Sequence, residues 1–150
     1  MMRHTIVKLI SILLIILWVY ASSSKLFHYA DFLVQLGRQP LAKWLIPGIS
    51  IGLPVLELMT AFLLCFRWTR KAGLWLSFGL MACFTLYVAL ALSGVFGEIP
   101  CSCGGILNSM GWKTHVVFNI CYTIIAFMGI YLINKNKELN VHIRKQSVPE

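Results

Sequence analysis

Four long apolar runs dominate the chain and restrict the folds that are open to it. They lie at residues 5–21, 45–66, 72–96 and 115–133. Each of the last three reaches about 20 residues, the length that an α-helix needs to cross the hydrocarbon core of a bilayer. Of the 150 residues, 59% are hydrophobic and 12% are charged, and a soluble domain typically has about twice that charged share. The sequence therefore predicts an all-α membrane protein, a bundle of four transmembrane helices.

The N-terminal run allows two interpretations. It follows Arg3 and ends in Val-Tyr-Ala at residues 19–21, so it resembles a secretory signal with a cleavage site. Retained, it completes an even number of spans, both chain ends lie on one side of the membrane, and an extension of the helix to Phe27 is open. We expect it to be retained, which gives a four-helix membrane domain over residues 1–134 and a basic cytoplasmic tail over residues 135–150.

The basic residues carry information about orientation. They lie between and outside the apolar runs, so the net charge of +8 indicates topology signals and argues against a nucleic-acid partner. A cytoplasmic N-terminus puts nine of the thirteen Lys and Arg residues inside, including those of the short loop at residues 67–71. The four that remain outside are Lys25, Arg38, Lys43 and Lys113. We predict a multi-pass protein of the bacterial inner membrane, with both termini cytoplasmic and residues 99–115 extracytoplasmic.

The connection between the first two runs contains a short amphipathic pattern. Phe27, Phe32, Leu33 and Leu36 have helical spacing in FHYADFLVQLGRQP, and Gly37 and Pro40 follow them. This spacing is typical of a short helix that lies at the membrane interface.

Aromatic residues near the ends of the runs predict an aromatic belt at both membrane boundaries. Those expected near the outer boundary are Trp18, Tyr20, Trp44 and Trp112, and those near the inner boundary are Trp68 and Trp75. A second packing signal is the pair Gly48 and Gly52, four residues apart, which predicts a close approach to a neighbouring helix of the bundle or, as the alternative, to a second copy.

Glu57 lies midway along the second apolar run. An ionisable group at that depth is unfavourable in lipid, so it should face the bundle interior and be paired or protonated. Two interpretations are open. One is a protonated carboxyl that is hydrogen-bonded to a neighbouring helix, for instance to Asn119 or Thr85. The other is a proton relay or a contact with a buried head group.

The fourth run carries His115, Asn119 and Thr123 at four-residue intervals, a polar stripe that should face other helices. His115 comes directly after the loop at residues 99–114. It could lower the pKa of a thiol, accept a proton, or cap the start of the helix, and the sequence leaves these three roles open.

The loop between the third and fourth runs contains Cys101 and Cys103, followed by Gly104 and Gly105. A Cys-x-Cys spacing holds the two Cα atoms about 5.5–7 Å apart, within reach of a strained and exchange-prone disulfide. The glycines leave the backbone accessible beside the sulfur atoms. An oxidising compartment favours a redox pair. Half of a metal site with His115, or two inert thiols, are the alternatives. We assign no role to the three cysteines within the predicted spans, Cys65, Cys83 and Cys121.

Four segments carry a resemblance to a known family: ASSSKLFHYADF, LPVLELMTAFLL, RWTRKAG and IPCSCGG. With them the chain resembles the MauE branch of the DoxX-like membrane proteins over most of residues 6–133. The resemblance implies a membrane partner for thioredoxin-like proteins, implicated in forming the disulfides of the methylamine dehydrogenase light subunit. It places Cys101 and Cys103 at the paired cysteines of the family and Glu57 at its acidic residue. The broader DoxX family includes subunits tied to quinones, which makes a quinone a candidate electron carrier.

We interpret the chain as a membrane thiol–disulfide redox protein that exchanges electrons with an extracytoplasmic thioredoxin-like partner. Cys101 and Cys103 are the expected reacting residues. The expected supporting residues are Glu57, His115, Asn119, Gly104 and Gly105. Two other classes are open, a non-enzymatic membrane scaffold or redox-complex subunit with a structural disulfide, and a small metal-handling protein. The direction of electron flow and the oligomeric state are left open by the sequence.

Overall fold

The computed structural model describes residues 2–39, 42–93 and 112–146, and this part of the chain is helical without any strand. Four helices in it are long and apolar enough to cross a membrane, with mean hydropathies of 1.9–2.2. They are α1 (Met2–Phe27), α3 (Ile46–Cys65), α4 (Arg70–Leu92) and α6 (Trp112–Gln146). The predicted fold class, an all-α membrane protein with four spans, is therefore confirmed.

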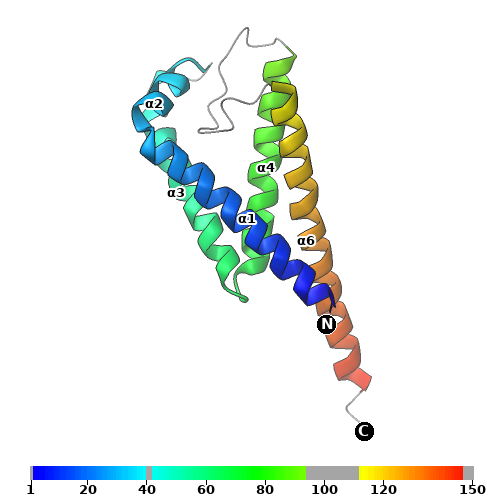
Figure 1. The fold of residues 1–150 in the computed structure, drawn as a ribbon. Coiled ribbons are helices and arrows are strands. Elements are labelled where there is room, and N and C mark those ends of the chain that lie inside the picture. Colours follow the sequence, from blue (N-terminus) through cyan, green and yellow to red (C-terminus); the bar gives the residue numbers. More distant parts are fainter. Residues whose placement is uncertain (1, 40–41, 94–111, 147–150) are drawn as a thin grey trace.

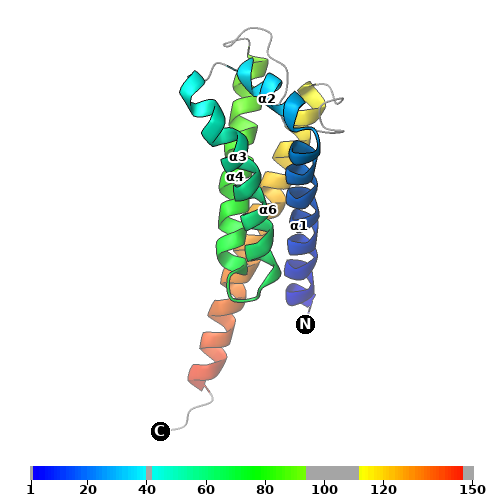
Figure 2. The ribbon, with the colours of Figure 1, turned by 90° about the vertical axis from the view of Figure 1, so that its left-hand side faces the viewer.

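The four long helices form a ring in chain order. The most extensive contacts are those of α1 with α3 and of α4 with α6, and contacts of α3 with α4 and of α1 with α6 close the ring. Figures 1 and 2 show the N-terminus, the α3–α4 turn and the C-terminal extension of α6 toward one end, which we call the terminal end. At the other end, the α2 end, α1 and α4 finish, α3 and α6 begin, and the short helix α2 lies (Figure 1).

The short helix α2 (Tyr29–Gly37) follows α1 directly, and a single turn of 3₁₀ helix at Lys43–Leu45 precedes α3. The buried residues of α2 are Phe32 and Leu36, which are one turn apart and face the bundle. The predicted short helix that ends at Gly37 is thus confirmed, and its position at a membrane interface stays a prediction. Phe27 belongs instead to the end of α1 and is 85% exposed.

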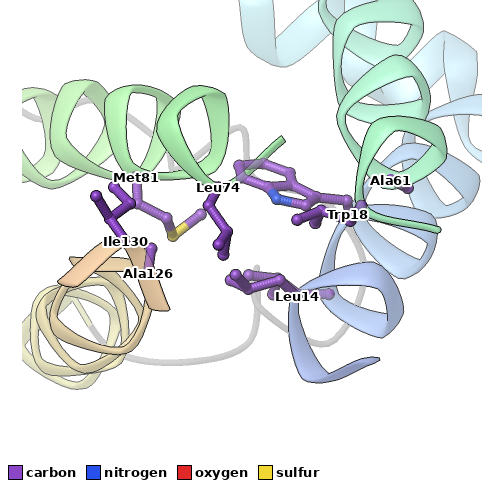
Figure 3. Close-up of a cluster of buried hydrophobic side chains, with 9 residues drawn as sticks. Leu14, Trp18, Ala61, Leu74, Met81, Ala126 and Ile130 are labelled. Carbon is purple, nitrogen blue, oxygen red and sulfur yellow. The ribbon is translucent and has the colours of Figure 1, made fainter. Parts of the chain in front are cut away.

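A tightly packed core occupies the middle of the bundle and reaches toward the terminal end. Leu14 and Trp18 of α1, Leu74 of α4 and Ala126 of α6 are fully buried in it, and Figure 3 shows them converging from different helices. The indole Nε1 of Trp18 donates a hydrogen bond to Ser77 Oγ at 2.9 Å. The prediction of Trp18 as a belt residue is wrong, because the side chain points across the bundle and meets no lipid.

Two glycines allow close helix contacts, and they are not the pair that the sequence suggested. A Cβ atom added at Gly73 would lie 3.0 Å from the backbone nitrogen of Leu64, and one at Gly129 would lie 2.9 Å from Leu74 Cδ2. Gly48 and Gly52 have no described atom within 4 Å of such a Cβ. The predicted close approach at those two glycines within the bundle is therefore wrong.

Helix α6 is longer than the predicted fourth span, which ended at Ile133. It continues to Gln146 through NKNKELNVHIRKQ, a stretch without Pro or Gly that contains several strong helix formers. Figure 1 shows this extension projecting past the other helices at the terminal end. The basic tail is helical over most of its length, and its cytoplasmic location stays a prediction.

Candidate functional site

A buried ion pair joins the two helices that flank the connection at the α2 end. Lys25 Nζ lies 2.7 Å from Glu57 Oε1, and the two side chains are only 3% and 1% exposed. Lys25 also donates a hydrogen bond to the carbonyl oxygen of Ala21 at 3.3 Å. Glu57 was predicted to face the interior and to be paired or protonated, and the structure confirms the interior position and shows a pair. The partner is Lys25, and the example partners, Asn119 and Thr85, are wrong.

The geometry of a helix explains why Lys25 reaches inward. Helical side chains tilt toward the N-terminus of their own helix, and α1 has its N-terminus at the terminal end. Lys25, in the last turn of α1, therefore extends back along the helix toward Ala21 and the interior of the bundle. Glu57 is on α3, which packs along α1. A lysine counted among the outer charges thus acts as the counter-charge of a carboxylate in the span.

A second contact across the same two helices supports this arrangement. Ser22 Oγ donates a hydrogen bond of 3.1 Å to the carbonyl oxygen of Pro54, one turn before Glu57. Pro54 lies inside α3 and has no N–H group to give to the helical ladder. Ser22 and Lys25, three residues apart, therefore fix one face of α1 against the proline-containing turn of α3.

The ion pair lies in the wall of a cavity of about 190 Å³. Apolar and aromatic side chains make most of its lining: Leu17, Trp18, Ala21, Phe32, Leu36, Leu53, Met81, Phe84 and Phe118. Six polar residues among those described also line it: Lys25, Gln39, Glu57, Tyr87, His115 and Asn119. These residues come from α1, α2, α3, α4 and α6 and from the connection after α2, so every α-helix of the described chain contributes to the cavity.

The predicted polar stripe on α6 faces the other helices, as expected. His115 is 1% exposed and Asn119 is 3% exposed, and both line the cavity. Thr123 Oγ1 lies 3.3 Å from Thr85 Oγ1 of α4. The structure thus brings three of the predicted supporting residues, Glu57, His115 and Asn119, to one cavity.

Two buried polar atoms of this cavity have no hydrogen-bond partner among the described residues. They are Glu57 Oε2, the carboxylate oxygen that does not bind Lys25, and Asn119 Nδ2. Buried polar groups are almost always hydrogen-bonded in folded proteins. The site therefore has one acceptor, Glu57 Oε2, and one donor, Asn119 Nδ2, that could each bind a further molecule.

Several residues of the site were missed by reasoning from the sequence. Lys25 was counted as an orientation signal, although an intramembrane carboxylate commonly pairs with a basic residue of another helix. Gln39 and Tyr87 are hydrogen-bonded to each other, Tyr87 donating to Gln39 Oε1, and join the connection after α2 to α4. Nothing in the sequence indicated that pair.

The predicted redox residues, Cys101 and Cys103, lie outside the described residues, as do Gly104 and Gly105. The segment that carries them leaves α4 after Leu92 and enters α6 at Trp112, and both points are at the α2 end (Figure 1). His115 is one turn into α6 from that entry point. The described cysteines, Cys65, Cys83 and Cys121, are free and exposed on the outer surface of the bundle.

The fold of the described residues and the composition define a multi-pass helical membrane protein with a buried ion pair beside a cavity between its helices. The chain belongs to the MauE family. The model of that family, described as methylamine utilisation protein MauE, matches residues 3–132 and so covers the first three spans, most of the fourth and the Cys-x-Cys segment. Searches of curated proteins and of solved structures give no significant match.

Proposed function

We propose that this protein is a membrane thiol–disulfide oxidoreductase, whose Cys101 and Cys103 exchange electrons with an extracytoplasmic thioredoxin-like partner. The observation that carries the proposal is a Cys-x-Cys pair inside the part of the chain that matches the MauE family. Two further features support it. The segment with the pair joins α4 to α6 at the α2 end, and the ion pair and cavity lie in the same half of the bundle.

The exchange needs both sulfur atoms. A thiolate of one cysteine attacks a disulfide of the partner, forms a mixed disulfide and releases one partner thiolate. The second cysteine then attacks its neighbour's sulfur, which forms the Cys101–Cys103 disulfide and releases the partner fully reduced. Each cycle moves two electrons from this pair to the partner, and the reverse cycle oxidises a partner dithiol. We assign the attack to Cys103, because Gly104 and Gly105 leave its sulfur less hindered.

The test is a trap for the mixed disulfide. Cys101→Ser removes the resolving sulfur, so the partner should stay covalently attached in native membranes, visible on a non-reducing gel and released by reductant. Cys103→Ser should trap less, and Cys65→Ser, which changes an exposed cysteine of α3, should trap nothing. Mass spectrometry of the released protein should identify a thioredoxin-like fold.

Other results would favour the other classes. If neither Cys101→Ser nor Cys103→Ser captures a protein and both keep full function in the cell, the redox proposal is wrong and a scaffold with a structural disulfide replaces it. If the purified protein retains stoichiometric zinc or copper that both variants lose, the cysteines serve a metal instead.

A further inference from the structure

The cavity at the α2 end has polar atoms placed for a ligand. Glu57 Oε2 accepts and Asn119 Nδ2 donates, both atoms are buried, and neither has a partner among the described residues. The other polar groups near them are engaged: Lys25 binds Glu57 Oε1, Tyr87 binds Gln39, and the indole of Trp18 binds Ser77. A molecule in the cavity would meet one free acceptor and one free donor.

The size and walls of the cavity restrict the body of that molecule. A dry apolar cavity of about 150 Å³ in another protein accommodates benzene, so about 190 Å³ has room for one substituted ring. The walls include the rings of Trp18 and Phe84, whose centroids are 6.3 Å apart, and that of Phe118. Aromatic rings favour offset or edge contacts with other rings.

The described lining of the cavity offers few polar atoms to water. It is mostly carbon, and among the described residues that line it only Glu57 Oε2 and Asn119 Nδ2 lack a hydrogen-bond partner. An apolar ring with one polar group suits such a lining better than a cluster of water molecules, each of which needs two to four polar partners.

We propose that this cavity is a binding site for a small aromatic molecule that carries a hydroxyl group. The hydroxyl hydrogen is donated to Glu57 Oε2, the Asn119 amide donates to an oxygen of the ligand, and the ring packs against Trp18 and Phe84. The proposal is independent of the thiol exchange proposed above, because it requires only residues of the described helices.

Quenching of Trp18 fluorescence tests the proposal directly. The probe is dibromophenol, whose bromine atoms quench a nearby indole, added in mildly acidic buffer to the purified full-length protein in nanodiscs. We expect saturable quenching that Trp18→Phe abolishes. The matched control is Trp75→Phe, which removes a half-exposed tryptophan outside the cavity and should keep the saturable phase.

The polar contacts are tested by changing the probe and the protein. Dibromoanisole has the same ring but no hydroxyl hydrogen, so it should bind about tenfold more weakly than the phenol. In Lys25→Met/Glu57→Met, which removes the acceptor together with its counter-charge, the two probes should bind alike. Asn119→Leu should weaken the binding of both probes by about tenfold, because each can accept a hydrogen bond from the amide.

Two results would overturn the proposal. Non-saturable quenching that is equal in the wild type and Trp18→Phe would mean that the probe only partitions into lipid. Equal affinities of phenol and anisole for the wild-type protein would mean that water or a lipid chain meets the polar atoms. The comparison of phenol with anisole uses the wild-type protein alone, so a folding defect in any of the variants leaves that test intact. Cysteine trapping is unaffected by either result, so the two proposals fail separately.

Discussion

Lys25 and Glu57 are both almost fully buried, so each charge needs the other as its counter-charge. Removing one partner of a buried ion pair leaves an uncompensated charge, whereas replacing both by apolar residues of similar size is often neutral or stabilising. We therefore expect Lys25→Met and Glu57→Met each to lower the free energy of unfolding by about 3 kcal/mol. The double variant should recover most of that loss, as measured by unfolding in mild detergent.

The control for this pair is Lys43→Met, which removes an exposed lysine at the same end of the bundle and should change the stability little. A double variant as unstable as the sum of its two single variants would show that the charges are not coupled. In that case each side chain would be stabilised by groups other than its partner in the ion pair.

At the residue scale, the sequence predicted which polar residues lie inside the bundle, but it did not predict which residues they bind. The position of Glu57 in an apolar run is enough to place it inside the bundle, and the four-residue spacing of His115 and Asn119 is enough to place them on one face. The partner of Glu57 is 32 residues away in the chain. Finding it requires the relative rotation and height of α1 and α3, which depend on side-chain packing along both helices.

At the scale of the helices, Gly73 is the described glycine that comes closest to the backbone of another helix, α3. A Cβ at this position would lie 3.0 Å from the backbone nitrogen of Leu64 and 3.1 Å from the carbonyl carbon of Leu63, and backbone atoms cannot move aside as a side chain can. We expect Gly73→Ala to destabilise the protein by about 1–3 kcal/mol. Thermal unfolding in detergent measures this loss.

Two other glycines calibrate that result. Gly129→Ala should cost less, because its nearest neighbour is the end of the Leu74 side chain, which can rotate. Gly48→Ala should be neutral or slightly stabilising, since open space surrounds it and alanine favours a helix. An equal loss of stability in all three variants would contradict the packing described for Gly73.

The length and type of the helices could largely be predicted from hydropathy, but their faces could not. Trp18 was expected at the lipid boundary because of its distance along the span, yet it is fully buried and bonded to Ser77. Hydropathy measures depth along an axis and contains no information on which side of a uniformly apolar helix is covered. The end of α6 was missed for a related reason, because hydropathy marks where the apolar run ends and the helix continues beyond it.

For the whole molecule, the buried ion pair strengthens the orientation argument. Lys25 is paired inside the bundle, so it should not be counted as an outer charge, and nine basic residues then oppose three. Reporter fusions after Glu150 and within residues 67–71 should be active as cytoplasmic reporters, and a fusion after Gly105 should be active only as an exported one. A cytoplasmic signal from the Gly105 fusion would remove the oxidising compartment on which the thiol chemistry depends.

The ring of helices in chain order also has a consequence for synthesis. Helix α1 leaves the ribosome before α3, so the ammonium group of Lys25 reaches the bilayer before the carboxylate of Glu57. The more deeply placed charge therefore enters the membrane when its counter-ion is already there, and the unfavourable state of a lone carboxylate in hydrocarbon need not persist. We therefore expect the insertion of α3 to be coupled to its docking onto α1. If α3 were inserted without α1, the carboxylate of Glu57 would enter the membrane without its counter-ion, Lys25.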